Sequence, residues 1–144
     1  MQTGKTLASM LLLLAISFLP PGMSASWDAA ELEAKGVLLR YFDALSQGDT
    51  ITLRSLMAGN LLESRRLLLG NPLWPGYLGS EFGSAEFSVE RTQATGPDEV
   101  SIDTRIVFAE DDYVVRRFVL RRQDGSAAVP SPFRVFEEYD PGLL

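Results

Sequence analysis

Apolar residues recur at three- and four-residue intervals early in the chain, and this spacing predicts an amphipathic helix over residues 28–47. Asp28 suits the N-cap of this helix, with Glu31 three residues later as its capping-box partner. Gly48 suits the left-handed residue that ends a helix, and Asp49 suits the N-cap of the next one. The predicted apolar stripe comprises Leu32, Val37, Leu38, Tyr41, Phe42 and Leu45.

Two shorter helices are expected after this joint, over residues 50–58 and 61–69. Gly59 and Asn60 would end the first, and the run Gly70-Asn71-Pro72 would end the second. Residues 72–84 are rich in Gly, Pro and aromatic residues, which predicts an ordered loop with one helical turn.

The period of the pattern then changes from 3.6 to two, which predicts strands over residues 85–94, 99–109, 113–122 and 133–139. Turn signals separate them at 96–98, 110–112 and 123–125. Helices followed by a strand meander indicate an α+β domain, with helices packed on a curved antiparallel sheet of about four strands.

The faces of this sheet depend on register, because a slip by one residue exchanges them. If partners in the hairpin at 110–112 have numbers with an even sum, Arg116 is the only charge on the apolar face. In the first strand, Phe87, Val89 and Arg91 would share a side. The opposite face of the sheet would carry Asp103, Arg105, Arg117 and Arg121, either as a charged dimer surface or as a solvated face.

Residues 1–25 have the form of a signal peptide: Lys5 precedes an uncharged apolar run that is too short to span a membrane. We therefore expect an exported protein, periplasmic or extracellular, with no membrane association after cleavage. An uncleaved N-terminal anchor is the alternative. Residues 26–140 would form a single domain, and residues 141–144 a loose tail.

Composition excludes several kinds of chemistry. The formal net charge is −6, so nucleic acid is not an expected partner. The chain has no His and no Cys, which leaves no usual zinc ligands, no His-based triad and no thiol nucleophile. Glu110-Asp111-Asp112 lacks the spacing of a calcium loop, so a hairpin turn is expected there. No metal and no cofactor are predicted.

The segment from Tyr41 to Asp49, with Leu53 and Leu56 after it, carries a resemblance together with the order of elements. Over residues 28–139 the chain resembles the nuclear transport factor 2-like superfamily, also called the cystatin-like or SnoaL-like cone. The resemblance implies a cone-shaped domain with a small-molecule pocket. The superfamily includes isomerases, dehydratases, cyclases, transport factors and ligand-binding or scaffold domains, so the fold does not select a function.

Comparison with the ketosteroid isomerases of this superfamily indicates that their catalytic set is missing. Tyr41 falls where these enzymes keep an oxyanion-stabilising tyrosine. Their carboxylate base falls at Arg65, which cannot accept a proton, and their second oxyanion donor falls near Phe118 or Val119. The dehydratases use a His, which is absent here.

The main functional hypothesis is a non-catalytic module that binds a small apolar or anionic ligand or a protein partner. Tyr41 would donate to a ligand oxygen, and Arg116 would hold an anionic or carbonyl group. In the alternative, Tyr41 is a core residue and Arg116 forms an ion pair with Glu63, Glu86 or Glu90. The pocket mouth would carry the aromatic residues Trp74, Tyr77 and Phe82, which would either line it or plug it.

Two other functions stay open at this stage. One is an isomerase- or cyclase-type enzyme that uses Tyr41 and a shifted carboxylate, Glu63 or Asp43. The other is a structural subunit that forms a homodimer through the outer face of the sheet.

Overall fold

The structure is a computed structural model, and it describes residues 23–123 and 132–143. Of the signal peptide expected at residues 1–25, the first 22 residues lie outside this part of the chain, so that assignment stays a prediction. No helix within the described residues is long and apolar enough to cross a membrane.

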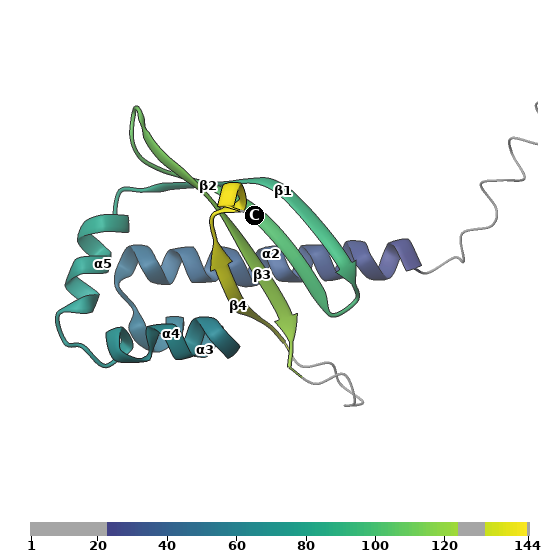
Figure 1. The fold of residues 1–144 in the computed structure, drawn as a ribbon, viewed down its shortest axis with the longest axis horizontal. Coiled ribbons are helices and arrows are strands. Elements are labelled where there is room, and N and C mark those ends of the chain that lie inside the picture. The colour runs from purple at the N-terminus through teal and green to yellow at the C-terminus, as the bar shows by residue number, and fades with distance from the viewer. Residues whose placement is uncertain (1–22, 124–131, 144) are drawn as a thin grey trace, which may run out of the picture.

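Within the described residues, four helices precede a four-stranded sheet (Figure 1). The helices are α2 (Met23–Gln47), α3 (Thr50–Leu56), α4 (Gly59–Leu69) and α5 (Trp74–Phe82). The strands are β1 (Glu86–Gly96), β2 (Glu99–Ala109), β3 (Asp112–Arg122) and β4 (Phe133–Tyr139), and each pairs antiparallel with the next. This arrangement confirms the predicted α+β class. The expected loose tail instead contains a short 3-10 helix, η2 (Pro141–Leu143).

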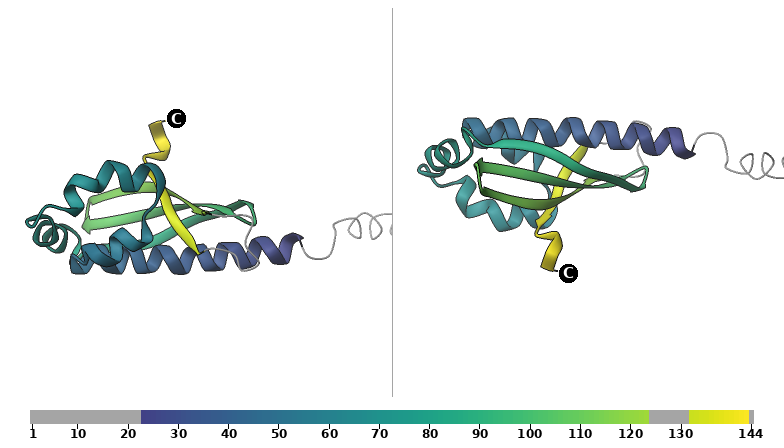
Figure 2. Two further views of the ribbon diagram at one scale, coloured as in Figure 1. Left: turned by 90° about the horizontal axis from the view of Figure 1, so that it is seen from below. Right: turned by 90° about the horizontal axis from the view of Figure 1, so that it is seen from above.

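The long helix α2 lies along the sheet, and α5 closes the end of the molecule where α2 finishes (Figure 2). The β2–β3 hairpin reaches toward the same end, where Phe108 contacts Phe82 of α5 with ring centroids 5.7 Å apart. The helix α4 packs on β4. The helices and the sheet therefore enclose a space between α4, α5 and the inner face of β2 and β3.

The helix joint has the predicted form. Gly48 has a φ of 64°, and the side chain of Asp49 accepts a hydrogen bond from the backbone N–H of Thr52 at 3.1 Å. A Cβ at position 48 would collide with the carbonyl oxygen of Pro75, at the start of α5. Gly48 therefore serves both the turn and the close approach of α2 to α5.

Several details of the helices differ from prediction. Because α2 begins at Met23, Asp28 lies inside the helix, and Glu31 instead accepts a hydrogen bond from the backbone N–H of Ala94 at 3.0 Å. Leu32 is 74% exposed, and the buried stripe runs through alanines 30 and 34.

The shorter helices also have different bounds. The helix α3 ends at Leu56, and Gly59, with a φ of 55°, begins α4 rather than ending the helix before it. The predicted loop at 72–84 contains the nine-residue helix α5, because Pro75 lies in its first turn, where a missing N–H costs nothing.

The predicted register of the β2–β3 hairpin is confirmed. Ile102 faces Phe118 and Thr104 faces Arg116, so the even-numbered residues share the inner face. In β1 a bulge between Val89 and Arg91 reverses the alternation, so Arg91 is exposed and the prediction for its face was wrong.

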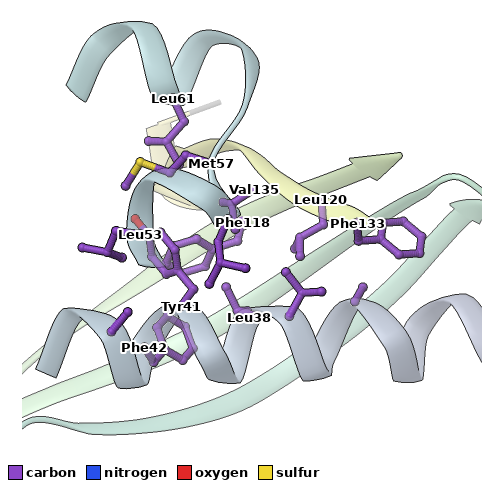
Figure 3. Packing of buried hydrophobic residues seen from close by; sticks show 14 of the residues in the cluster. Leu38, Tyr41, Phe42, Leu53, Met57, Leu61, Phe118, Leu120, Phe133 and Val135 are labelled. Carbon is purple, nitrogen blue, oxygen red and sulfur yellow. The ribbon is translucent and has the colours of Figure 1, made fainter. Parts of the chain in front are cut away.

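The inner face and the helices share one hydrophobic core (Figure 3). Phe118 is its central aromatic residue, with ring centroids 5.9 Å from Tyr41 and 5.3 Å from Phe42. Beyond α3, Met57 forms a parallel bridge to Val135 at the outer edge of β4, so the link between α3 and α4 lies against that edge. These contacts fix α2, α4 and the sheet around the enclosed space.

Candidate functional site

A cavity of about 630 Å³ occupies this space. Its size falls within the range of small-molecule sites, roughly 300–1,000 Å³. The structure brings all five residues proposed from sequence to its wall: Tyr41, Trp74, Tyr77, Phe82 and Arg116. The other lining residues are mostly apolar and include Leu45, Leu78, Ile106, Phe108 and Phe118.

Tyr41 lies two turns before Gly48 on α2, and its side chain is buried at 2% exposure. Its hydroxyl points away from α2 (Figure 3) and makes no hydrogen bond to any residue in the described ranges. Burial, with the negative charge of Glu138 as a second cause, raises the pKa of the phenol far above its ordinary value. The hydroxyl is therefore a neutral donor at any physiological pH, and it is free to bond to a ligand.

Two arginines and one glutamate lie at the same end of the cavity. The Nε of Arg116 lies 3.4 Å from Oε1 of Glu138, and a terminal nitrogen of Arg65 lies 3.8 Å from Oε2 of the same carboxylate. The Glu138 side chain is 17% exposed, against 31% for Arg116 and 37% for Arg65. Arg116 does form an ion pair, but its partner is Glu138 rather than one of the glutamates at positions 63, 86 and 90.

Glu138 reaches the cavity because of a second bulge. Val135 faces Leu120 and Glu137 faces Val119, which leaves Phe136 as an extra residue in β4. The residue after Glu137 therefore turns to the inner face, opposite Phe118. Simple alternation from Phe133 would have placed Glu138 on the outer face, so sequence reasoning missed it.

Several apolar and aromatic residues of the cavity wall are exposed to solvent and form its mouth. Trp74 is almost fully buried in its wall, whereas Tyr77, Leu73 and Val114 are 58%, 78% and 40% exposed. Phe82 packs against Phe108 from the tip region of the β2–β3 hairpin. The aromatic segment thus lines the mouth and does not fill the space behind it.

The carboxylates considered for an enzyme do not reach the cavity. Asp43 is exposed and accepts hydrogen bonds from the Gln47 side chain at 3.0 and 3.1 Å. Glu63 is 72% exposed and lies 3.7 Å from Arg66. The expectation that either would supply the carboxylate was wrong, and Glu138 is the acid that lies beside Tyr41. Within residues 23–123 and 132–143 no group of three acidic side chains could hold a metal ion.

The outer face of the sheet carries the four charged residues predicted for it. Arg117 donates to both oxygens of Asp103, at 2.6 and 2.9 Å, and Arg105 donates to Glu90 at 2.6 Å. Arg121 donates to Glu99 at 2.7 Å. These hydrogen bonds lower the pKa of Asp103 and Glu99 below their ordinary values. The outer charges are therefore satisfied by one another.

Comparison of the chain with protein-family models, with curated proteins and with solved structures found no match.

Proposed function

We propose that this protein binds a small, largely apolar molecule through the cavity between its helices and sheet, and that it does so without catalysis. One observation carries this proposal: Tyr41 lines a cavity of about 630 Å³, and its hydroxyl has no hydrogen-bond partner within the described residues. A ligand oxygen in the cavity could accept a hydrogen bond from this hydroxyl, and a typical hydrogen bond contributes about 0.5–1.5 kcal/mol.

The composition of the wall supports the same reading. Apolar side chains dominate it, and its charged side chains among the described residues are Arg65, Arg116 and Glu138. A pocket of this kind holds an apolar body by burial and orients it by a few polar contacts. The order of helices and strands is also what the resemblance implies, so we infer membership of the nuclear transport factor 2-like superfamily.

Native mass spectrometry of the protein purified from its own host tests the proposal, because it reports the mass of a co-purifying molecule. In parallel, the fluorescence of Trp74 should respond to small amphiphiles added to the purified protein. Tyr41→Phe should weaken the response, whereas Tyr113→Phe should leave it unchanged, because Tyr113 lies outside the cavity wall and is 51% exposed. A protein with no bound mass and no fluorescence response would refute ligand binding.

Catalysis is a second candidate, favoured by the position of Glu138 beside the same cavity as Tyr41. A carboxylate and a phenol could serve as base and oxyanion donor for a carbonyl compound. The two arginines next to Glu138 favour the binding role, because one guanidinium lies beside each of its carboxylate oxygens, at 3.4 and 3.8 Å. Incubating the co-purified molecule in D₂O with wild type and Glu138→Gln would decide: deuterium uptake that depends on Glu138 supports catalysis.

Export and dimer formation through the outer sheet face are further proposals. The apolar run at residues 7–19 supports export. Light scattering of the mature protein tests pairing, and a strict monomer at high concentration would contradict it.

A further inference from the structure

We infer that the cavity selects amphiphiles with a single negative charge at one end, and that Glu138 sets this limit. The inference rests on the proposed binding function and specifies the chemical class of the ligand.

The charge of the cavity wall is the first step. Among the described residues that line it, the charged ones are Arg65, Arg116 and Glu138, which together carry a net charge of +1. The Tyr41 hydroxyl adds a neutral donor, since burial holds its phenol protonated. One monoanion neutralises this end of the cavity, whereas a dianion leaves an excess negative charge next to the carboxylate of Glu138.

The second step is the length of the ion pairs that Glu138 forms with Arg65 and Arg116. Glu138 lies 3.4 and 3.8 Å from the two guanidinium groups, with no hydrogen bond to either, whereas Arg117 on the outer face holds Asp103 at 2.6 Å. Each guanidinium carries five N–H donors. Arg65 and Arg116 therefore keep donors for a second anion while Glu138 stays in place.

The placement of apolar residues is the third step. From Arg116, the inner face continues through Val114 toward the hairpin, and the opposite wall continues through Trp74 to the exposed Leu73 and Tyr77. An acyl or alkyl chain would follow this apolar wall toward the mouth, with its head group at the arginines. The ligand class is therefore an amphiphile with one anionic head.

Three probes with the same chain separate head-group charge from chain burial: decane-1-sulfonate, decyl phosphate and decan-1-ol. At pH 8 their heads carry a charge of −1, about −2 and zero. Trp74 fluorescence would report binding in a Trp27→Phe background, because Trp27 is not among the residues that line the cavity. Wild-type protein should bind the sulfonate roughly tenfold more tightly than either other probe.

Glu138→Gln should raise the cavity charge to +2, so the preference for sulfonate over phosphate should fall roughly tenfold or reverse. Glu137→Gln is the matched control, because Glu137 is the adjacent residue, faces outward and pairs with Arg121. If Glu138→Gln does not fold, Arg65→Gln gives the converse test: with no net charge in the cavity, sulfonate should bind no better than the alcohol.

The outcomes separate the two proposals. Equal affinity of wild type for decan-1-ol and the sulfonate would overturn this inference and leave ligand binding intact. An unchanged sulfonate-to-phosphate ratio in a folded Glu138→Gln would overturn the role of Glu138. No response to any of the three probes, together with no co-purifying mass, would overturn the binding function itself.

Discussion

The two faces of the sheet use the same kinds of charged residue to different ends. On the outer face, Arg117 and Asp103 meet in a bidentate pair at 2.6 and 2.9 Å. On the inner face, Arg116 lies 3.4 Å from Glu138 and shares it with Arg65, beside a tyrosine hydroxyl without a partner in the described residues. Two adjacent arginines of β3 therefore differ: Arg116 belongs to a cluster with long ion-pair distances, and Arg117 to a pair with short hydrogen bonds.

This difference shows which charges are available for binding. An arginine that already makes two short hydrogen bonds to a carboxylate has its preferred partner, as Arg117 has in the partly buried Asp103. An arginine that faces a cavity and shares one carboxylate keeps donors for another molecule. We therefore propose the inner face as the binding face, although the outer face carries more charge.

The largest difference between the two faces should be the loss of stability when a side chain is truncated to alanine. Phe118→Ala on the inner face should lower the free energy of unfolding by about 3–5 kcal/mol, because it leaves a cavity in the core. Val115→Ala, on the outer face of the same strand, should cost less than about 1.5 kcal/mol. Urea unfolding of both variants measures the contrast, and similar costs would mean that the core is not confined to the inner side.

Gly48→Ala tests the joint that brings α5 over the inner face. It should cost about 2 kcal/mol, because φ is positive there and the new Cβ would meet the Pro75 carbonyl. Gly36→Ala is the control, since a Cβ built there, in the interior of α2, has no atom of the described residues within 4 Å apart from its chain neighbours and the nearby backbone of the same helix. The free energy of unfolding of this control should rise by about 0.5–1 kcal/mol. A similar loss of stability in both variants would show that the backbone conformation at Gly48 is not the cause.

Tyr41→Phe should separate stability from binding. Because the hydroxyl has no partner within the described residues and faces the cavity, its removal should change the free energy of unfolding by less than about 1 kcal/mol, while amphiphile binding weakens. Chemical denaturation and Trp74 fluorescence measure the two effects on the same sample. A larger loss of stability would indicate that the hydroxyl is satisfied within the protein.

The outer pair should contribute less. A double-mutant cycle on Asp103 and Arg117, using alanine at each, should give a coupling of about 0.5–1 kcal/mol that decreases in 1 M salt. The same cycle on Arg105 and Glu90 is a useful comparison, because that pair is more exposed and should couple still more weakly. Coupling above this range in high salt would contradict the assignment of these pairs to a solvated surface.

The stability that the Asp103–Arg117 pair contributes should depend on pH. The pKa of Asp103 is held below its ordinary value of 3.8 by its hydrogen bonds to Arg117. Its contribution to stability is therefore complete above about pH 5 and is lost as pH falls through the lowered pKa. The difference in unfolding free energy between wild type and Asp103→Asn should be constant from pH 8 to 5 and should shrink toward pH 2. A difference that instead grows on acidification would refute the lowered pKa.

The fold was predictable from sequence where the local pattern of apolar and polar residues determines the structure without help from tertiary packing. The β2–β3 hairpin follows strict alternation, so its register and both faces were correct, and Gly48 with Asp49 gave the joint. The helix α5 was missed because Pro75, Gly76 and Gly79 lower helix propensity, and tertiary packing on α2 overrides that preference.

The candidate site was predictable only in part. Tyr41 and Arg116 follow from the periodicity of their own elements, so both were placed at the wall of the cavity from sequence. Glu138 depends on the extra residue in β4, and nothing local in Val135-Phe136-Glu137 distinguishes a bulge from regular alternation. The charge balance of the cavity, on which the proposed ligand class depends, therefore required the structure.

The edges of the sheet also have a consequence for self-association. An open edge strand is a template for adding further strands, which leads to aggregation. At β4 the backbone N–H of Ala58 donates to the carbonyl of Val135 at 3.0 Å, and at β1 the bulge and the Glu31 carboxylate interrupt the free edge at Ala94. Each edge strand thus has one of its free backbone groups engaged by a different element, which should hinder the addition of a further strand at that position.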